Sequence, residues 1–150
     1  MKRYRFNLEP VRQQRKVVYE QKAGEFALAM AQLKVEQQQL AEIHHRQAET
    51  ISAFNEKRRQ EGFTARDSVL YLAYLDRLAD DEKIQIVAVE KADERVKTAR
   101  EALDQARIQY EIMEKMKEKS REQYDYGLNR EEQNFLDELG GMTSARSKLS

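Results

Sequence analysis

The sequence of 150 residues contains no cysteine and no tryptophan, and it has only one proline and five glycines. Without cysteine the chain can form neither disulfide bonds nor thiolate metal sites, which fits a reducing compartment. No apolar run approaches the length of about 20 residues that a membrane span requires, and none follows the first ten residues as the core of a signal peptide would. We therefore expect a soluble, cytoplasmic protein.

A surplus of charge of one sign is also missing. The 27 basic residues balance the 27 acidic ones, and the two signs are mixed along the sequence. Binding to a nucleic-acid backbone needs a sustained positive field, so this balance argues against nucleic acid as a partner. With 40% hydrophobic and 36% charged residues, the chain is too polar to fill a thick globular core. Long helices that share one narrow apolar seam are expected instead.

Residue types that could form a catalytic or metal site are present, but not in a suitable arrangement. His44 and His45 are adjacent, so on a helix they point about 100° apart and cannot share a metal as an i, i+4 pair could. The acidic run "DDE" at residues 80–82 has no nucleophile, phosphate loop or second ligand set beside it. We predict a non-enzymatic protein with no metal and no cofactor.

Residues that typically begin or end a helix occur at two places in the sequence. Pro10 is suited to the first turn of a helix, where a missing N–H does no harm. In "RRQEGFTARD", Gly62 can end a helix in a left-handed conformation, and Thr64 can cap the next one with Asp67 completing a capping box. These signals predict two long helices joined by a short turn.

The predicted fold class is all-α, a long two-helix antiparallel coiled-coil hairpin over residues 1–126. The helices are expected at about 8–60 and about 64–126, with the turn at about 61–64, and would be roughly 75 and 95 Å long. In the remaining part, residues 127–150, Gly127 and Asn129 suggest the start of a short third helix, and "GGMTSARSKLS" suggests a flexible tail.

The second helix has the clearest periodicity. Eight consecutive apolar positions alternate spacings of three and four, as in a coiled coil. They are Val89, Ala92, Val96, Ala99, Leu103, Ala106, Tyr110 and Met113. In the first helix Phe26, Leu33 and Leu40 recur every seven residues, whereas Val11 and Val18 keep another phase.

Residues that face each other across this hairpin should have numbers that sum to about 125. The alignment sets Phe26 against Ala99 and Leu33 against Ala92, so that a large side chain meets a small one in each layer. It also sets the start of the first helix against Lys117, which leaves the end of the second helix without a partner.

The segment "DSVLYLAYLDRL" just after the turn holds more apolar residues than one seam can bury. A helical wheel puts Tyr71, Leu75 and Leu78 on the seam and leaves Leu70, Leu72 and Tyr74 outside the arc of about 100° that one partner helix covers. Two explanations stay open. Either the loop or a second hairpin covers the hairpin end, or the surplus residues bind a different protein. We favour a partner-binding surface.

The opening "YRFNLEPVRQQRKVVYEQ", the charged two-helix pattern and the "YLAYLDRL" block together resemble the FliJ family, soluble proteins of the flagellar type III export apparatus. The resemblance covers nearly the whole chain. It implies a coiled coil similar to a rotary ATPase stalk, monomeric alone, that binds the hexameric flagellar export ATPase and the cytoplasmic domain of the export gate and escorts export chaperones. Such a protein reaches the inner face of the cell membrane at the flagellar base only through these partners.

The resemblance also implies a gate-contacting surface on both helices beside the turn. On the second helix its positions are Tyr71, Tyr74, Leu78 and Gln85, and on the first helix they are Leu40, His44, Gln47 and Ile51. With Leu70 and Leu72 from the helical wheel, these residues form the predicted partner-binding set.

Two other interpretations compete with this one. The chain could be the equivalent stalk protein of a virulence-type secretion system or of a rotary ATPase. It could also be a structural coiled coil that homodimerises through the crowded segment.

Overall fold

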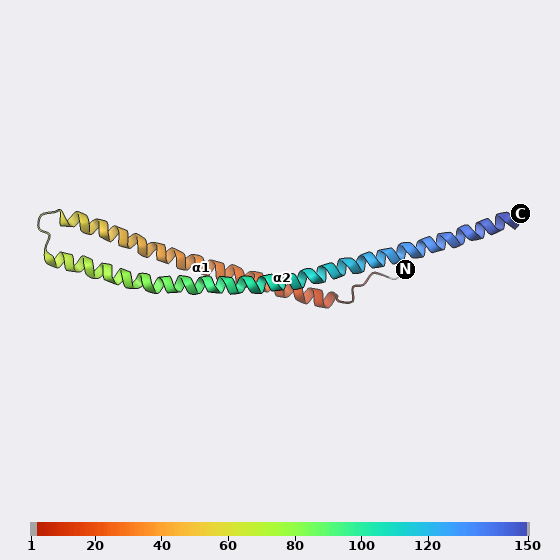
Figure 1. Cartoon of the computed structure of the whole chain (residues 1–150), viewed down its shortest axis with the longest axis horizontal. Coiled ribbons are helices and arrows are strands. Elements are labelled where there is room, and N and C mark those ends of the chain that lie inside the picture. Colours follow the sequence, from red (N-terminus) through yellow and green to blue (C-terminus); the bar gives the residue numbers. More distant parts are fainter. Residues whose placement is uncertain (1–2, 150) are drawn as a thin grey trace. The chain divides into compact units, whose positions relative to one another are not determined.

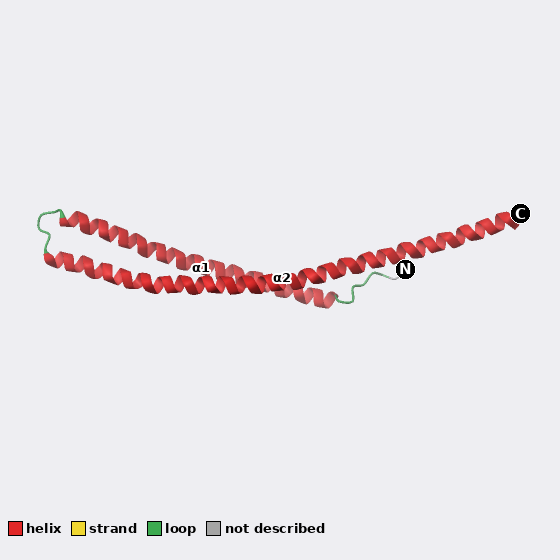
Figure 2. Cartoon of the chain, in the orientation of Figure 1, coloured by secondary structure: helices red, strands yellow, loops and turns green. Residues whose placement is uncertain are grey.

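The computed structural model describes residues 3–149, which are almost entirely helical (Figure 2). Helix α1 spans Glu9–Arg58 and helix α2 spans Ala65–Leu149. The two helices run in opposite directions on either side of a short turn (Figure 1), and no strand occurs between residues 3 and 149. The predicted all-α, antiparallel two-helix hairpin is confirmed.

The turn between the helices has the chemistry expected from its sequence. Gly62 adopts a positive φ of 86°, a left-handed conformation that any side chain would strain. The backbone N–H of Thr64 donates to Asp67 Oδ2 at 3.0 Å, and the Asp67 N–H donates to Thr64 Oγ1 at 3.3 Å. This reciprocal pair is the predicted capping box. It also lowers the pKa of the Asp67 carboxyl, chiefly through the hydrogen bond from the Thr64 backbone.

The helices form two compact units, each made of a stretch of α1 and a stretch of α2. The turn unit comprises residues Gln21–Asp104, and the terminal unit comprises the described residues up to Glu20 together with those from Gln105 onward. Each unit has its own seam between the two helices.

The seam of the turn unit follows the predicted heptad register. Leu78, Ala92 and Val96 are buried on α2. On α1 Phe26 is half-buried, as are the positions that follow it at heptad spacing: Ala29, Leu33, Glu36, Leu40, Ile43, Gln47, Thr50 and Phe54. The Phe54 ring lies 5.4 Å from the Tyr71 ring, which is the alignment that the sequence predicts.

The terminal unit continues the pairing with more polar and aromatic contacts. Ala106 and Met113 of α2 are buried, so all eight predicted seam positions of this helix are buried or half-buried. Beside them the rings of Tyr19 and Tyr110 stack at a centroid distance of 5.8 Å and an interplanar angle of 7°. Offset stacking of this kind adds to the area that the rings bury.

The end of α2 differs from the sequence-based expectation. Instead of a separate short helix from about residue 127 and a flexible tail, α2 continues without a break through Gly127 to Leu149. A single glycine costs only about 1 kcal/mol inside a helix. The residues around Gly127 keep the backbone helical at that cost, so Asn129 has no helix start to cap.

Candidate partner-binding surface

The crowded segment after the turn divides between the seam and the surface, as the helical wheel predicts. Leu78 is only 3% exposed, and Tyr71 and Leu75 are half-buried. Phe54 packs between two aromatic neighbours, because the Phe63 ring lies 6.0 Å away on the side of the turn and the Tyr71 ring lies on the other helix. These residues close the seam at the turn.

The three surplus residues are exposed. Leu70 is 63% exposed, Leu72 is 52% exposed and Tyr74 is 43% exposed. Phe63, the apolar residue of the turn, is directed at Phe54 and does not cover them. The chain therefore does not fold back over its own surplus residues, and that explanation for the crowded segment is excluded.

Two of these residues line a groove between the helices. We call it the turn-proximal groove, and its lining residues are Glu49, Thr50, Ala53, Leu70, Tyr71 and Tyr74. Its volume is about 510 Å³. The α2 side of the groove is aromatic and aliphatic, whereas the α1 side is small and polar. An apolar side chain of a partner could lie against Leu70 and Tyr74 here.

The predicted residues of α1 differ in what they can offer a partner. Leu40 and Gln47 are half-buried in the seam, whereas His44 and Ile51 are exposed. His44 Nε2 lies 3.5 Å from an oxygen of Glu82. Direct contact from α1 is therefore available at His44 and Ile51.

Gln47 and Gln85 form polar contacts across the seam. The amide of Gln47 donates to Glu82 Oε2 at 2.6 Å, and this bond is the main cause of the lowered pKa of the Glu82 carboxyl. The amide of Gln85 donates to the backbone carbonyl of Glu36 at 2.9 Å. Both glutamines are therefore engaged in holding the two helices together.

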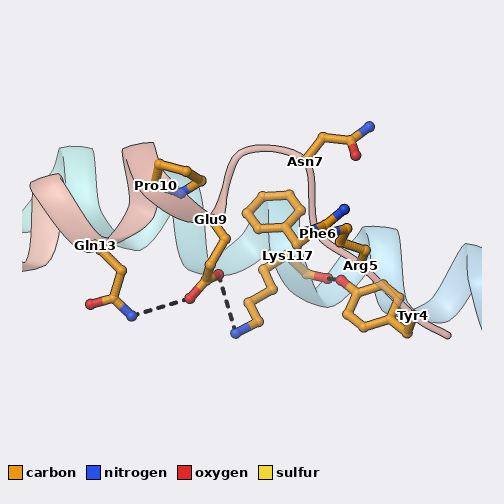
Figure 3. A pocket seen from close by; sticks show the side chains of 8 residues that line it. All are labelled: Tyr4, Arg5, Phe6, Asn7, Glu9, Pro10, Gln13 and Lys117. Atoms are coloured by element: carbon orange, nitrogen blue, oxygen red, sulfur yellow. Dashed lines mark hydrogen bonds and ion pairs between the residues drawn. The ribbon is translucent and has the colours of Figure 1, made fainter.

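A second surface, in the terminal unit, was not expected from the sequence. The segment that precedes α1 lies along α2 and lines a hollow of about 800 Å³ (Figure 3). Its lining residues are Tyr4, Arg5, Phe6, Asn7, Glu9, Pro10, Gln13 and Lys117. The Tyr4 hydroxyl donates to the Lys117 backbone carbonyl at 3.2 Å, and the Tyr4 ring lies 5.3 Å from the ring of Tyr124.

An ionic cluster follows directly on this segment. The guanidinium of Arg12 donates to both oxygens of Glu9, at 2.8 and 2.9 Å, and to Glu114 Oε1 at 2.5 Å. Lys117 Nζ adds an ion pair with Glu9 at 3.4 Å. These contacts link α1 to α2 near the start of α1.

Hydrogen bonding shifts the pKa values in this cluster. The bond from Arg12 lowers the pKa of Glu9 to about 2, and Glu9 in turn raises the pKa of Arg12. Hydrogen bonds from Tyr110 and then Arg12 lower the pKa of Glu114, and the same Tyr110 to Glu114 bond raises the pKa of Tyr110. The sequence carries no local signal for this cluster, because Arg12 and Glu114 are 102 residues apart.

The residues that the structure describes include neither a metal-binding cluster nor a candidate membrane span. Among them, no three or more histidine or acidic side chains gather closely enough to hold a metal ion. Within residues 3–149, neither helix has a stretch apolar enough to span a bilayer.

Comparison with known proteins gives one matching family model and one similar solved structure. The family model described as "Flagellar FliJ protein" matches residues 4–149. A solved structure of CT670, a YscO homolog from Chlamydia trachomatis, is 23% identical over 99% of both chains, with a TM-score of 0.44. A comparison with curated proteins gives no match.

Proposed function

This chain belongs to the flagellar FliJ protein family, and on that premise we propose that it is a stalk-like coiled coil linking the hexameric export ATPase to the cytoplasmic domain of the export gate. In this role the chain catalyses nothing, and the partner ATPase supplies the energy. The protein works in the cytoplasm and reaches the membrane at the flagellar base through these partners. Escort of export chaperones belongs to the same proposal.

One observation carries the gate-binding part of the proposal. Leu70 and Tyr74 stay exposed beside the turn and form the apolar side of the turn-proximal groove. Tyrosine is among the residues that dominate the energy of protein interfaces, and Leu70 adds exposed apolar surface beside Tyr74. The groove is therefore the centre of the proposed contact.

The ten predicted residues take two roles in this proposal. Five of them are exposed and would contact the gate directly: Leu70, Leu72, Tyr74, His44 and Ile51. The other five are half-buried or buried and would position these side chains by holding the helices in register: Leu40, Gln47, Tyr71, Leu78 and Gln85.

Binding of purified components tests the proposal. Tyr74→Ala and Leu70→Ala should each weaken binding to the cytoplasmic domain of the export gate by about tenfold or more. Circular dichroism should show unchanged helix content, because both side chains are exposed. Binding to the export ATPase, measured in parallel, should stay at its wild-type strength.

Ile84→Ala serves as the matched control. Ile84 is another strongly exposed aliphatic residue of α2, and it does not line the turn-proximal groove. Its substitution should leave both affinities unchanged. If Ile84→Ala weakened gate binding as much as Tyr74→Ala, or if the wild-type chain bound neither partner, the proposed function would be wrong.

A further inference from the structure

The last part of α2 carries an apolar stripe that is largely exposed. The stripe consists of Leu128, Phe135, Leu139, Met142 and Leu149. Phe135 is 61% exposed and Met142 is 63% exposed. One turn before the stripe, Tyr124 still packs against Tyr4 of the N-terminal segment. The stripe therefore begins one helical turn beyond the residue that Tyr4 contacts.

The spacing of the stripe continues the pairing face of α2. From Tyr124 onward its members follow at steps of four, seven, four, three and seven residues, which are the steps of a coiled-coil seam. This segment also includes Gly140 and Gly141, each of which weakens a helix by about 1 kcal/mol. Most helical stability in proteins comes from the packing of an apolar face. A partner that is itself helical fits this face.

We propose that residues 128–149 of α2 pair in an antiparallel arrangement with the same residues of a second copy of this chain. In a two-fold pair, if one residue faces a second, then the second faces the first. With Phe135 opposite Met142, the alignment also brings Leu128 opposite Leu149. Four of the five stripe residues thus face one another, whereas Leu139 falls opposite Glu138 beside the two-fold axis.

The charges of the segment fit the same alignment. Glu131 falls opposite Arg146, which forms two ion pairs across the two-fold axis. Leu136, on the flank of the stripe, falls opposite Gly141, so a large residue meets one without a side chain. A parallel pair would instead set Glu131 against its own copy, and facing like charges are destabilising. Glu138 lies near its own copy in both arrangements. The charge pattern therefore favours the antiparallel pair over the parallel one.

This self-association departs from the monomer expected from the sequence. The sequence predicted a short helix and then a flexible tail in residues 127–150, whereas α2 is helical to Leu149 and presents a regular apolar face. The proposed contact is also distant in sequence from the turn-proximal groove, so it concerns a different surface from the one in the proposed function.

Sedimentation equilibrium on the full chain, at concentrations from about 1 to 500 μM, tests whether the pair forms. The wild-type chain should dimerise, and Phe135→Glu should raise the dimer dissociation constant by about 30-fold or more. Tyr126→Glu is the control, because Tyr126 is exposed nine residues earlier and so on the opposite face of the helix. A wild-type chain that stays monomeric at every concentration would overturn the proposal. So would a dimer that Phe135→Glu leaves intact.

A charge swap separates self-pairing from binding to some other apolar surface. Glu131→Arg and Arg146→Glu should each weaken the dimer, because each places like charges opposite one another. The double variant Glu131→Arg with Arg146→Glu should restore it. Additive weakening in the double variant would contradict the proposed alignment.

Crosslinking tests the direction of the pair, and the absence of cysteine makes single introduced thiols unambiguous. Leu139→Cys lies next to the proposed two-fold axis, so a short bismaleimide should crosslink this variant to itself. Leu128→Cys should crosslink to Leu149→Cys when the two variants are mixed, and not to itself. Self-crosslinking of Leu128→Cys would show a parallel pair and overturn the antiparallel one.

Discussion

Gln85 of α2 donates its side-chain amide to two acceptors of Glu36 on α1, the backbone carbonyl at 2.9 Å and the carboxylate at 2.5 Å. Both residues are half-buried in a seam that is otherwise largely apolar. A polar contact in such a seam specifies which residues face each other, because other alignments leave the amide without an acceptor. The Gln85–Glu36 contact therefore fixes the register of the turn unit.

Replacement of Gln85 by alanine should lower the free energy of unfolding by about 1 kcal/mol, which is the usual net contribution of such a hydrogen bond. Urea unfolding followed by circular dichroism measures this change. Gln38→Ala is the control, since Gln38 is exposed on α1 and its replacement should change stability by no more than about 0.5 kcal/mol. Equal effects of the two substitutions would show that the Gln85 bond contributes nothing.

Truncation of Leu78 should destabilise the fold far more than truncation of Leu70, although the two residues are only eight positions apart. Leu78→Ala removes the most buried side chain of the crowded segment and should lower the free energy of unfolding by about 2–4 kcal/mol. Leu70→Ala should change it by less than about 0.5 kcal/mol, because Leu70 is exposed. Thermal unfolding of the two variants side by side makes the comparison. A large loss of stability in Leu70→Ala would place that residue in the core and remove it from the binding surface.

Much of the fold could be predicted from the sequence because its determinants are local. The seven-residue repeat of α2 defines a seam whatever its partner is, and Gly62 with the Thr64–Asp67 pair defines the turn. The division of the crowded segment into seam and surface residues follows from the same helical geometry.

What could not be predicted depends on contacts between distant residues or on small energy differences. Arg12 and Glu114 are far apart in the sequence, and nothing near either residue indicates that they meet. The continuation of α2 through Gly127 reflects a balance of about 1 kcal/mol, which a residue pattern does not resolve. Gln47 and Gln85 bond to residues of the opposite helix that are distant in sequence, so the sequence could not show these contacts either.

Removal of the capping box should weaken the start of α2. Thr64→Ala eliminates the oxygen that accepts from the Asp67 N–H and should lower the free energy of unfolding by about 1 kcal/mol. The same substitution should also increase the rate of amide hydrogen exchange in the first turn of α2. Thr64→Ser retains the hydroxyl and should stay close to the wild type; a serine variant as destabilised as the alanine variant would contradict a capping role.

The ionic cluster around Arg12 should make the stability of the terminal unit depend on acid pH. The pKa of Glu9 is about 2 in the folded chain, against an ordinary value of 4.5, so the folded state binds fewer protons than the unfolded state between these values. The stabilisation is therefore fully present above about pH 4.5 and is lost progressively as the pH falls toward 2. Thermal unfolding at a series of pH values measures this loss.

Glu9→Gln provides the comparison for the acid titration. A glutamine cannot titrate, so this variant should lose less stability than the wild type between pH 4.5 and 2. The lowered pKa of Glu114 contributes a further loss in both chains. An identical acid profile for the two chains would mean that Glu9 is not ion-paired in solution.

The seam is only one side chain deep, since no residue of α1 is fully buried and the buried residues of α2 follow one another along a single line. Each layer therefore depends mainly on the layers directly above and below it, as the rungs of a ladder do. A destabilising substitution in one layer should loosen the neighbouring layers without unfolding distant ones. Such a chain can open locally to bind another protein while the helices stay paired elsewhere.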